Sequence, residues 1–447
     1  MFKKKIRRSI FNIRKIPQNY KNITTLYKPI DFFNTLINSI SNAKKRIYLT
    51  VLYLEKDKGG RKVLESLYRA KMKNPNLEIA VLLDFHRAKR NRFGSNSDYT
   101  NSDWYKKIAN HHLSEVPIYG VPISYYEAFG IFHLKGCIID DFVIYSGASF
   151  SEVYLAQNKK SYRYDRYKII KNKHLSDAFS DYLKIYFLSN PAVIRLNILK
   201  KYNFFFQKHK IKVFKKKLKQ ANYKYLGCEK INKLGIIPLV GIGKNSFLNK
   251  IIQNLIFSAK KKIIISTPYF NFPKFFIQNI LNSLKKGKKV KIIVGDKTAN
   301  DFYISEEKNF RIVGILPYLY ENNLRKFIMN LQEFVQENKL TIKIWKNGEN
   351  TYHAKGLWID EEWQMFTGSN FNSRSWKLDL ENAILVHDPE KKLKEQNIKE
   401  LKKLEFNTKK IMHFSELQNI YEYPERIKNI LLKVTKTKID YFLKKII

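Results

Sequence analysis

The chain has 447 residues, of which 44% are hydrophobic and 14% aromatic, so it can build more than one hydrophobic core and is not a largely disordered protein. It carries 84 Lys and Arg against 39 Asp and Glu, and its net charge of +45 attracts anionic surfaces such as nucleic acid, the ribosome or acidic lipid. The chain is also rich in Ile, Asn, Phe and Tyr, as A/T-biased coding would make it. Charge alone therefore identifies no partner.

The N-terminal segment is basic but lacks the apolar stretch of about 7–15 residues that follows in a secretory signal. No window approaches the roughly 18–20 continuous apolar residues of a membrane-spanning helix. The two cysteines, Cys137 and Cys228, have no metal-site spacing and suit a reducing compartment. We expect a cytoplasmic protein that lies on a membrane without crossing it, and we expect no metal and no other cofactor.

The first half of the chain reads as helices alternating with short buried strands. A helical pattern, DFFNTLINSISNAKKR, runs into the strand pattern RIYLTVLYL, and a second strand pattern, EIAVLLD, ends at Asp84. The motif His-x-Lys-x4-Asp follows, with His133, Lys135 and Asp140. In an extended segment residues i and i+2 project to the same face, so His133 and Lys135 should point together.

The second half repeats these elements in the same order. AKKKIIISTPYF from Ala259 matches AKKRIYLTVLYL from Ala43, VKIIVGD matches EIAVLLD, and the second motif holds His353, Lys355 and Asp360. Three matches at nearly the same spacing indicate a tandem duplication. We predict an α/β fold of two domains, 1–210 and 230–447, each a mixed β-sheet flanked by helices, with the active site at the pseudo-twofold interface between them.

The two motifs together supply the groups that phosphodiester chemistry needs. One imidazole can attack phosphorus while the other protonates the leaving oxygen, and two lysines can neutralise the non-bridging oxygens. This chemistry requires no metal.

The arrangement resembles the phospholipase D superfamily, whose His-x-Lys-x4-Asp motif is followed after six residues by Gly-Ser-x-Asn. After Asp360 the sequence TGSN ends at Asn370, which has the family spacing although the glycine is displaced by one residue. After Asp140 the sequence GASF departs from the pattern and offers Ser149 as a substitute. We take Asn370 and Ser149 as candidate substrate-binding residues.

The resemblance also implies a carboxylate downstream of each histidine that orients it. Glu381 has this spacing behind His353, and Asp165 is the nearest counterpart behind His133. A surface or helix-capping role for Asp165 is an equal alternative.

Longer segments, among them LLDFHRAKRNRFG, HLKGCIIDDFVIYSGASFSEVYL and TGSNFNSRSWKLDLENAILVHDP, are similar to the phospholipase D-type phosphatidylserine synthases of Gram-negative bacteria. This similarity implies transfer of a phosphatidyl group from CDP-diacylglycerol to L-serine through a phosphatidyl-histidine intermediate, at the inner face of the cytoplasmic membrane. An unperturbed histidine pKa near 6.5 lets one imidazole be neutral and the other protonated. We assign His133 as the nucleophile and His353 as the acid, although the symmetry of the sequence permits the reverse.

Two alternatives stay open. The first is another activity of the superfamily, as a phospholipase, cardiolipin synthase or nuclease. The second is a basic nucleic-acid- or ribosome-binding protein, against which the two intact His-Lys pairs argue, although such adhesion could coexist with catalysis. The oligomeric state is open as well.

Three further segments have both a functional and a structural interpretation. The segment from Lys201 interleaves lysines with Phe204, Phe205 and Phe206, which is typical of a lipid-contacting segment but equally of a core helix with a basic face. A basic cluster could meet the CDP pyrophosphate or be a solvated surface; it comprises Arg87, Lys89, Arg90 and Arg92. A C-terminal apolar stripe should pack on the body of the protein; it comprises Ile427, Ile430, Leu431 and Val434, then Ile439, Phe442, Leu443 and Ile446.

Overall fold

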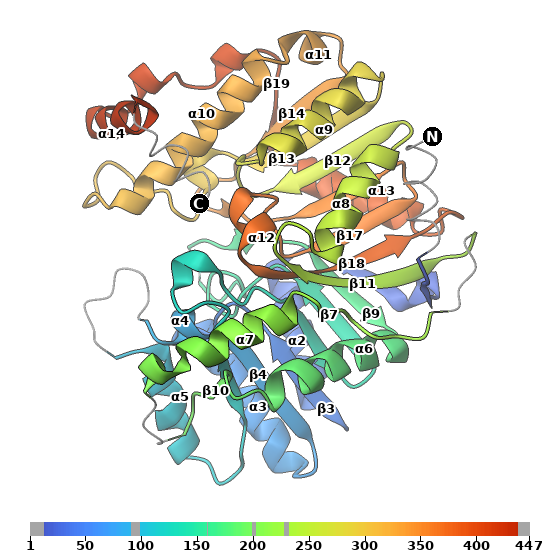
Figure 1. Ribbon diagram of the computed structural model, residues 1–447, viewed down its shortest axis with the longest axis vertical. Coiled ribbons are helices and arrows are strands. Elements are labelled where there is room, and N and C mark those ends of the chain that lie inside the picture. The colour runs from blue at the N-terminus through green and yellow to red at the C-terminus, as the bar shows by residue number, and fades with distance from the viewer. Residues whose placement is uncertain (1–12, 91–98, 159, 199–202, 228–231, 437–447) are drawn as a thin grey trace.

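A computed structural model describes residues 13–90, 99–158, 160–198, 203–227 and 232–436. Each half of the chain forms one large mixed β-sheet, and the two halves are stacked one above the other in Figure 1. The predicted duplicated α/β fold is confirmed.

The first sheet has the strand order β10-β5-β4-β3-β6-β7-β9-β2. Its members are β2 (Ile23–Leu26), β3 (Arg46–Thr50), β4 (Glu78–Asp84), β5 (Ile118–Val121), β6 (Gly136–Ile139), β7 (Phe142–Ser146), β9 (Tyr167–Lys171) and β10 (Ile194–Arg195). Strands β3, β4 and β5 are parallel, and the other pairs in the sheet are antiparallel. The two repeat strands of the sequence are therefore the central parallel pair, β3 and β4.

The second sheet repeats this order as β19-β14-β13-β12-β16-β17-β18-β11 and adds β1 at its edge. Its members are β1 (Ile16–Pro17), β11 (Gly235–Ile242), β12 (Lys262–Thr267), β13 (Lys289–Gly295), β14 (Leu340–Trp345), β16 (Gly356–Ile359), β17 (Trp363–Thr367), β18 (Leu380–His387) and β19 (Thr408–Ile411). Strand β1 pairs with β11, so the N-terminal strand lies in the second sheet and not in the predicted first domain.

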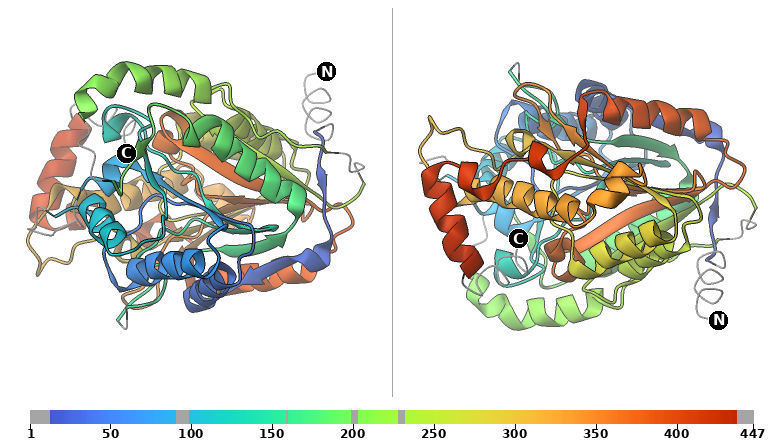
Figure 2. Two further views of the ribbon diagram at one scale, coloured as in Figure 1. Left: turned by 90° about the horizontal axis from the view of Figure 1, so that it is seen from below. Right: turned by 90° about the horizontal axis from the view of Figure 1, so that it is seen from above.

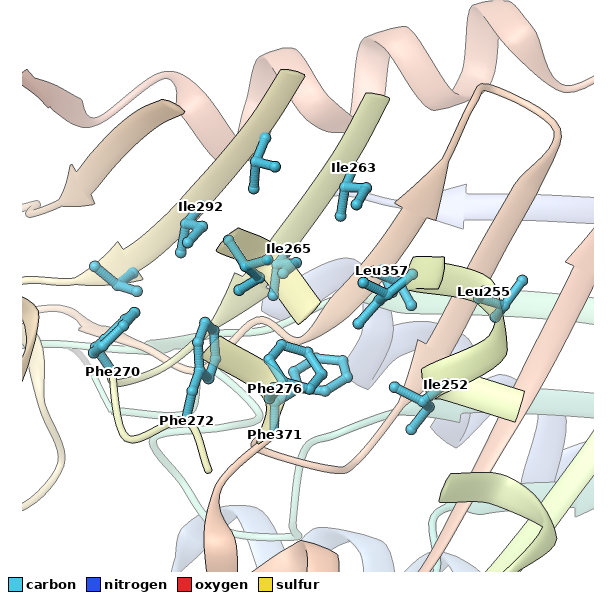
Figure 3. Close-up of a cluster of buried hydrophobic side chains, with 14 of the residues drawn as sticks. Ile252, Leu255, Ile263, Ile265, Phe270, Phe272, Phe276, Ile292, Leu357 and Phe371 are labelled. Carbon is cyan, nitrogen blue, oxygen red and sulfur yellow. The ribbon is translucent and has the colours of Figure 1, made fainter. Parts of the chain in front are cut away.

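Helices cover the outer face of each sheet (Figures 1 and 2). In the first half these are α2 (Pro29–Ser41), α3 (Lys58–Lys73) and α5 (Asn101–Asn110); in the second half they are α8 (Phe247–Ser258), α9 (Lys274–Lys285) and α10 (Leu316–Met329). Alternate strand residues face these helices, as period-2 geometry requires. Figure 3 shows Ile263 and Ile265 of β12 in one cluster with Phe276 of α9 and with Ile252 and Leu255 of α8.

The opposite faces of the sheets meet in a core shared by both halves. Tyr48 of β3 and Leu82 of β4 belong to the same cluster as Val240 of β11 and Ile384 of β18, and α6 (Lys173–Leu183) and α7 (Lys208–Leu218) add to it. A two-stranded parallel ladder, β8 (Arg163–Tyr164) with β15 (Thr351–Tyr352), joins the halves a second time. The other α-helices of the described residues are α4 (Phe85–Ala88), α11 (Gln332–Gln336), α12 (Ser373–Lys377), α13 (Lys394–Glu405) and α14 (Glu425–Lys436).

The Phe- and Lys-rich segment packs on this shared core. Helix α7 buries Ile211, Phe214 and Leu218 and turns its lysines outward. Before it, Phe204 stacks on Phe85 with ring centroids 4.5 Å apart. Phe205 is 74% exposed, and the Phe206 side chain lies outside the described part of the structure. The core-helix interpretation is thus observed, and lipid contact by the outer face stays a prediction.

The C-terminal stripe packs as predicted where it is described. Ile427 and Leu431 of α14 are buried against Tyr318 of α10, and Ile430 is partly buried there. The Val434 side chain and residues 439–446 lie outside the described residues. Among the described helices, none has the length and apolar character that crossing a bilayer demands.

Candidate active site

Both motif histidines line one cavity of about 1040 Å³ between the halves. His133 and Lys135 precede β6, and His353 and Lys355 lie between β15 and β16, so each pair is the extended lead into an equivalent strand. Lys135, Ser149, Asn370 and Glu381 also line the cavity. The predicted meeting of the motifs at the pseudo-twofold interface is therefore present in the structure.

The orienting carboxylates are exchanged between the halves. His133 Nδ1 lies 2.9 Å from Glu381 Oε2, and His353 Nδ1 lies 2.6 Å from Asp165 Oδ2. The sequence-based pairing of each histidine with the carboxylate downstream of it was wrong. The β8–β15 ladder places Asp165 beside His353, and backbone bonds that join Leu380 to residues 131 and 133 place Glu381 beside His133.

The residue after each carboxylate holds the backbone of the motif lysine that it faces. Asn382 accepts from Lys135 N and donates to Lys135 O, both at 2.8 Å. Arg166 Nη1 donates to Lys355 O at 2.9 Å. Sequence reasoning missed Asn382 and Arg166, whose only signal is that each directly follows an orienting carboxylate.

The two lysines differ in their contacts. Lys135 is 1% exposed and its Nζ has no hydrogen-bond partner among the described residues, whereas Lys355 Nζ contacts His353 and lies 3.5 Å from Asp165. Burial, followed by the neighbouring Lys355, lowers the pKa of Lys135 to about 7. Burial also lowers the pKa of Lys355, to about 8. An unpaired, buried ammonium of this kind is suited to meet a phosphate oxygen.

Both imidazoles favour the neutral form. Burial and then Lys135 lower the pKa of His133 well below its usual range, and burial and then Lys355 lower the pKa of His353 to about 4. The expectation that one of them is protonated at neutral pH does not hold for the free protein, because burial and the neighbouring lysines lower both pKa values.

The carboxylates break the symmetry of the site. Despite its burial, Asp165 has a lowered pKa, since Lys355 and the His353 hydrogen bond favour its anion. Burial and then the nearby Asp379 raise the pKa of Glu381 well above its usual range. His353 therefore has the more anionic partner and is the better carrier of a transferred proton.

The motif aspartates Asp140 and Asp360, which the sequence predicts to be catalytic, do not line the cavity, and their carboxylates bind backbone groups of their own half. Asp140 accepts backbone N–H groups of Lys44, Lys45 and Arg46 at 2.7–3.1 Å. Asp360 accepts the corresponding N–H groups of residues 260–262. Each aspartate thus fixes the loop that starts the neighbouring antiparallel strand, β3 or β12, which explains why the motif and the AKKR/AKKK segment recur together.

A longer turn accounts for the displaced glycine. The β16–β17 turn has one residue more than the β6–β7 turn, with Asp360 and Glu361 both at positive φ. Gly147 and Gly368 are thereby equivalent, and a Cβ at either would come within 3.0 Å of a site lysine of the other half. Both positions require glycine.

The same equivalence aligns Ser149 with Asn370. Asn370 donates to the Tyr269 hydroxyl at 3.0 Å, and its Oδ1 has no hydrogen-bond partner among the described residues. Both residues line the cavity and stay candidates for substrate contact.

The basic cluster predicted from the sequence lies only partly at the cavity. Arg87 and Arg90 line the cavity and form ion pairs of 2.8 and 3.0 Å with Glu127. Lys89 is not among the lining residues, and Arg92 lies outside the described part of the chain.

Sequence reasoning also missed a group beside His353. The Tyr154 hydroxyl lies 3.0 Å from His353 Nε2, and Arg163 and Asp301 line the cavity next to it. The one weak signal for Asp301 was its position shortly after the strand VKIIVGD. Within the described ranges, no three His, Cys, Asp or Glu side chains are grouped in a way that could hold a metal ion.

Comparisons with known proteins agree with this geometry. A family model described as "Cardiolipin synthase, PLD-like domain" matches residues 36–184 and 252–404, once in each half. The chain is 45% identical to the CDP-diacylglycerol–serine O-phosphatidyltransferase PssA of Escherichia coli, over 97% of this chain and 96% of that protein. It is 40% identical to the enzyme of the same name in Haemophilus influenzae, over 99% of each.

A crystal structure of phosphatidylserine synthase from Haemophilus influenzae superimposes on the whole chain with a TM-score of 0.95 and 38% identity, covering 100% of both chains. Because the family model, the relatives and this structure all include both halves, the likeness covers the complete site and not one domain alone. The chain belongs to the phospholipase D-like family, and its similarity to phosphatidylserine synthases extends over its full length.

Proposed function

We propose that this protein transfers a phosphatidyl group from CDP-diacylglycerol to L-serine and releases CMP. The observation that carries the proposal is the pair of crossed histidine–carboxylate contacts facing one cavity, in a chain that matches phosphatidylserine synthases from end to end. Two imidazoles and two lysines provide a nucleophile, a proton acceptor and the positive charge that a phosphoryl transition state requires.

In the first half-reaction His133 attacks the phosphorus next to diacylglycerol, an N–P bond forms and the P–O bond to CMP breaks. The hydrogen bond of Nδ1 to Glu381 leaves Nε2 as the attacking atom. Lys135 and Lys355 neutralise the non-bridging oxygens. CMP departs as a phosphate anion that needs little protonation, so the neutral His353 does not impede this step.

In the second half-reaction the serine hydroxyl gives its proton to His353 and attacks phosphorus, and the bond to His133 breaks. Asp165 stabilises the imidazolium that forms, because it lies 2.6 Å from Nδ1 and is held in its anionic form. This division of roles matches the sequence-based assignment and rests on the unequal carboxylates.

We further propose that the protein binds the anionic inner face of the cytoplasmic membrane through α7. The helix exposes Lys212, Lys216 and Lys217, and the exposed Phe205 precedes it. Lys215 donates to the carbonyl of Phe129, in the loop that also carries Glu127, the ion-pair partner of the cavity-lining Arg87 and Arg90. The basic face of α7 thus adjoins a loop that is paired with two cavity-lining arginines, and we place the entry of the lipid substrate on this side.

The test incubates purified protein with CDP-diacylglycerol and measures CMP and lipid products with and without L-serine. CMP release should rise with serine and yield phosphatidylserine, and His133→Ala should abolish both. His174→Ala, which changes an exposed histidine of α6, is the matched control and should retain activity. Equal CMP release without serine, with phosphatidic acid as the lipid product, would instead identify a hydrolase.

A further inference from the structure

Resting on the proposed function, we infer that Arg163 and Asp301 form the subsite that selects L-serine, with Arg163 binding its α-carboxylate and Asp301 its α-ammonium. The two residues come from different halves and line the cavity beside His353. Arg163 Nη1 lies 3.4 Å from Asp301 Oδ2. A zwitterionic amino acid needs one cation and one anion side by side, which this pair supplies.

The pair differs from the structural ion pair between the halves. Arg166 and Glu400 make two contacts, of 2.9 and 3.2 Å, with side chains that are 4% exposed, and neither lines the cavity. The Arg163 and Asp301 side chains are 15% and 20% exposed and share a single, longer contact at the cavity wall. A small ligand can therefore reach both without unpacking a core.

Both side chains keep bonding capacity. The guanidinium carries five N–H donors. Arg163 uses Nε to donate to Thr351 Oγ1 at 3.1 Å, which fixes its plane, and it lies over the Tyr154 ring at 4.7 Å. Among the described residues, the Asp301 carboxylate makes a single polar contact, the ion pair with Arg163.

The reacting hydroxyl has a place next to this pair. The Tyr154 hydroxyl lies 3.0 Å from His353 Nε2, the nitrogen that we assign as proton acceptor, and a serine hydroxyl that replaced this contact would lie beside Arg163. Arg163 contacts the same tyrosine ring. Since serine is small, its carboxylate and ammonium must be bound close to its hydroxyl, and Arg163 and Asp301 supply an oppositely charged pair next to this tyrosine.

Two arginines elsewhere in the cavity wall suit a different ligand. Arg87 and Arg90 share Glu127, so this group has a net positive charge that favours the pyrophosphate of CDP-diacylglycerol. Arg163 and Asp301 together are neutral, which favours a zwitterion, and Asp301 repels acceptors that carry only negative charge.

The test compares three acceptors: L-serine, ethanolamine, which lacks the carboxylate, and 3-hydroxypropionate, which lacks the ammonium. Arg163→Gln should lower kcat/KM for L-serine at least about tenfold and reduce the preference for L-serine over ethanolamine. Asp301→Asn should likewise reduce the preference for L-serine over 3-hydroxypropionate. Every acceptor attacks the same phosphoenzyme, so these ratios cancel any effect on CDP-diacylglycerol.

Arg195→Gln is the matched control, because it breaks a 2.7 Å ion pair with Glu115 outside the cavity, and it should leave both ratios unchanged. Arg163→Lys keeps the charge, should retain more of the serine preference, and replaces Arg163→Gln if that variant does not fold. Unchanged ratios in folded Arg163 and Asp301 variants would overturn the subsite while the proposed function stands. A wild-type protein that makes no phosphatidylserine would contradict the proposed function itself.

Discussion

The motif lysines are less basic than exposed lysines because both side chains are buried, Lys135 at the wall of the cavity and Lys355 beside His353. With pKa values of about 7 for Lys135 and about 8 for Lys355, a rise in pH removes from each the charge that meets the phosphate. A bound pyrophosphate stabilises both ammonium groups and raises their pKa values again. Charge on the lysines and substrate binding are therefore coupled.

This coupling predicts the basic limb of the pH profile. In the free protein Lys135 loses its proton as the pH passes about 7 and Lys355 as it passes about 8, so kcat/KM for CDP-diacylglycerol should begin to fall near pH 7 and fall more steeply above about pH 8. The fall of kcat should occur at higher pH, because kcat reports the pKa values of the enzyme–substrate complex. Lys135→Arg, whose guanidinium stays charged, should move the kcat/KM limb upward. A kcat/KM that is flat to about pH 9.5 would contradict this assignment.

The sequence predicted the motif histidines and lysines because chemistry constrains their type and spacing. It also predicted Glu381 and Asp165 as orienting residues, but not which histidine each contacts. Asn382 was missed since the contact that gives it a role is with Lys135 of the other half. Contacts between the two halves do not follow a fixed spacing along the chain, so a sequence motif cannot reveal them.

The turns that follow β6 and β16 contain the motif aspartates. In the structure these aspartates stabilise the start of a neighbouring strand and do not face the cavity. Asp140 and Asp360 lie at the far end of these strands from the histidines and accept the backbone N–H groups that begin β3 and β12. The sequence contained both halves of this contact, the aspartate and the lysine-rich segment. It gave no indication that they touch, since they are about a hundred residues apart in each half.

Removing the Asp360 carboxylate should therefore lower the stability of the fold more than the rate of the reaction. Asp360→Ala leaves three N–H groups with only water as partner, and we expect the free energy of unfolding to fall by about 1–3 kcal/mol. The kcat of the folded fraction should stay within a few-fold of wild type. Denaturant titration and steady-state kinetics on one preparation measure both quantities, with Asp140→Ala as the matched variant. Loss of kcat with unchanged stability would return Asp360 to the reaction.

Across the whole molecule, the duplicated sheets were predictable because each repeat carries its own strand pattern, with a buried strand ending in Asp and a motif after it. The assembly of the halves was not predictable. Strand β1 joins the second sheet, and the β8–β15 ladder crosses between the halves. The buried ion pair of Arg166 with Glu400 links the residue before β9 to α13. These contacts depend on three-dimensional proximity alone, yet they position both histidines.

The net charge of +45 has two explanations, compositional drift and attraction to an anionic partner, and the position of the lysines separates them. If α7 is the membrane-binding face, its exposed lysines should matter more than exposed lysines elsewhere. Figure 2 shows α7 and α13 on opposite sides of the molecule, and Lys402 and Lys403 of α13 are exposed as well. Two charge reversals on each helix change the net charge equally.

Lys212→Glu with Lys216→Glu should therefore weaken binding to anionic vesicles, by about 1 kcal/mol or more for each lysine, while Lys402→Glu with Lys403→Glu should have a smaller effect. Binding of the wild type should fall as salt rises, because charges are screened beyond about 10 Å at 0.1 M ionic strength. Vesicle co-sedimentation at several salt concentrations measures both, with RNA as a competitor. Equal effects of the two double variants would show that no single face of the protein carries the attraction to anionic surfaces. Adhesion to RNA or to the ribosome would then explain the positive charge as well as membrane binding does.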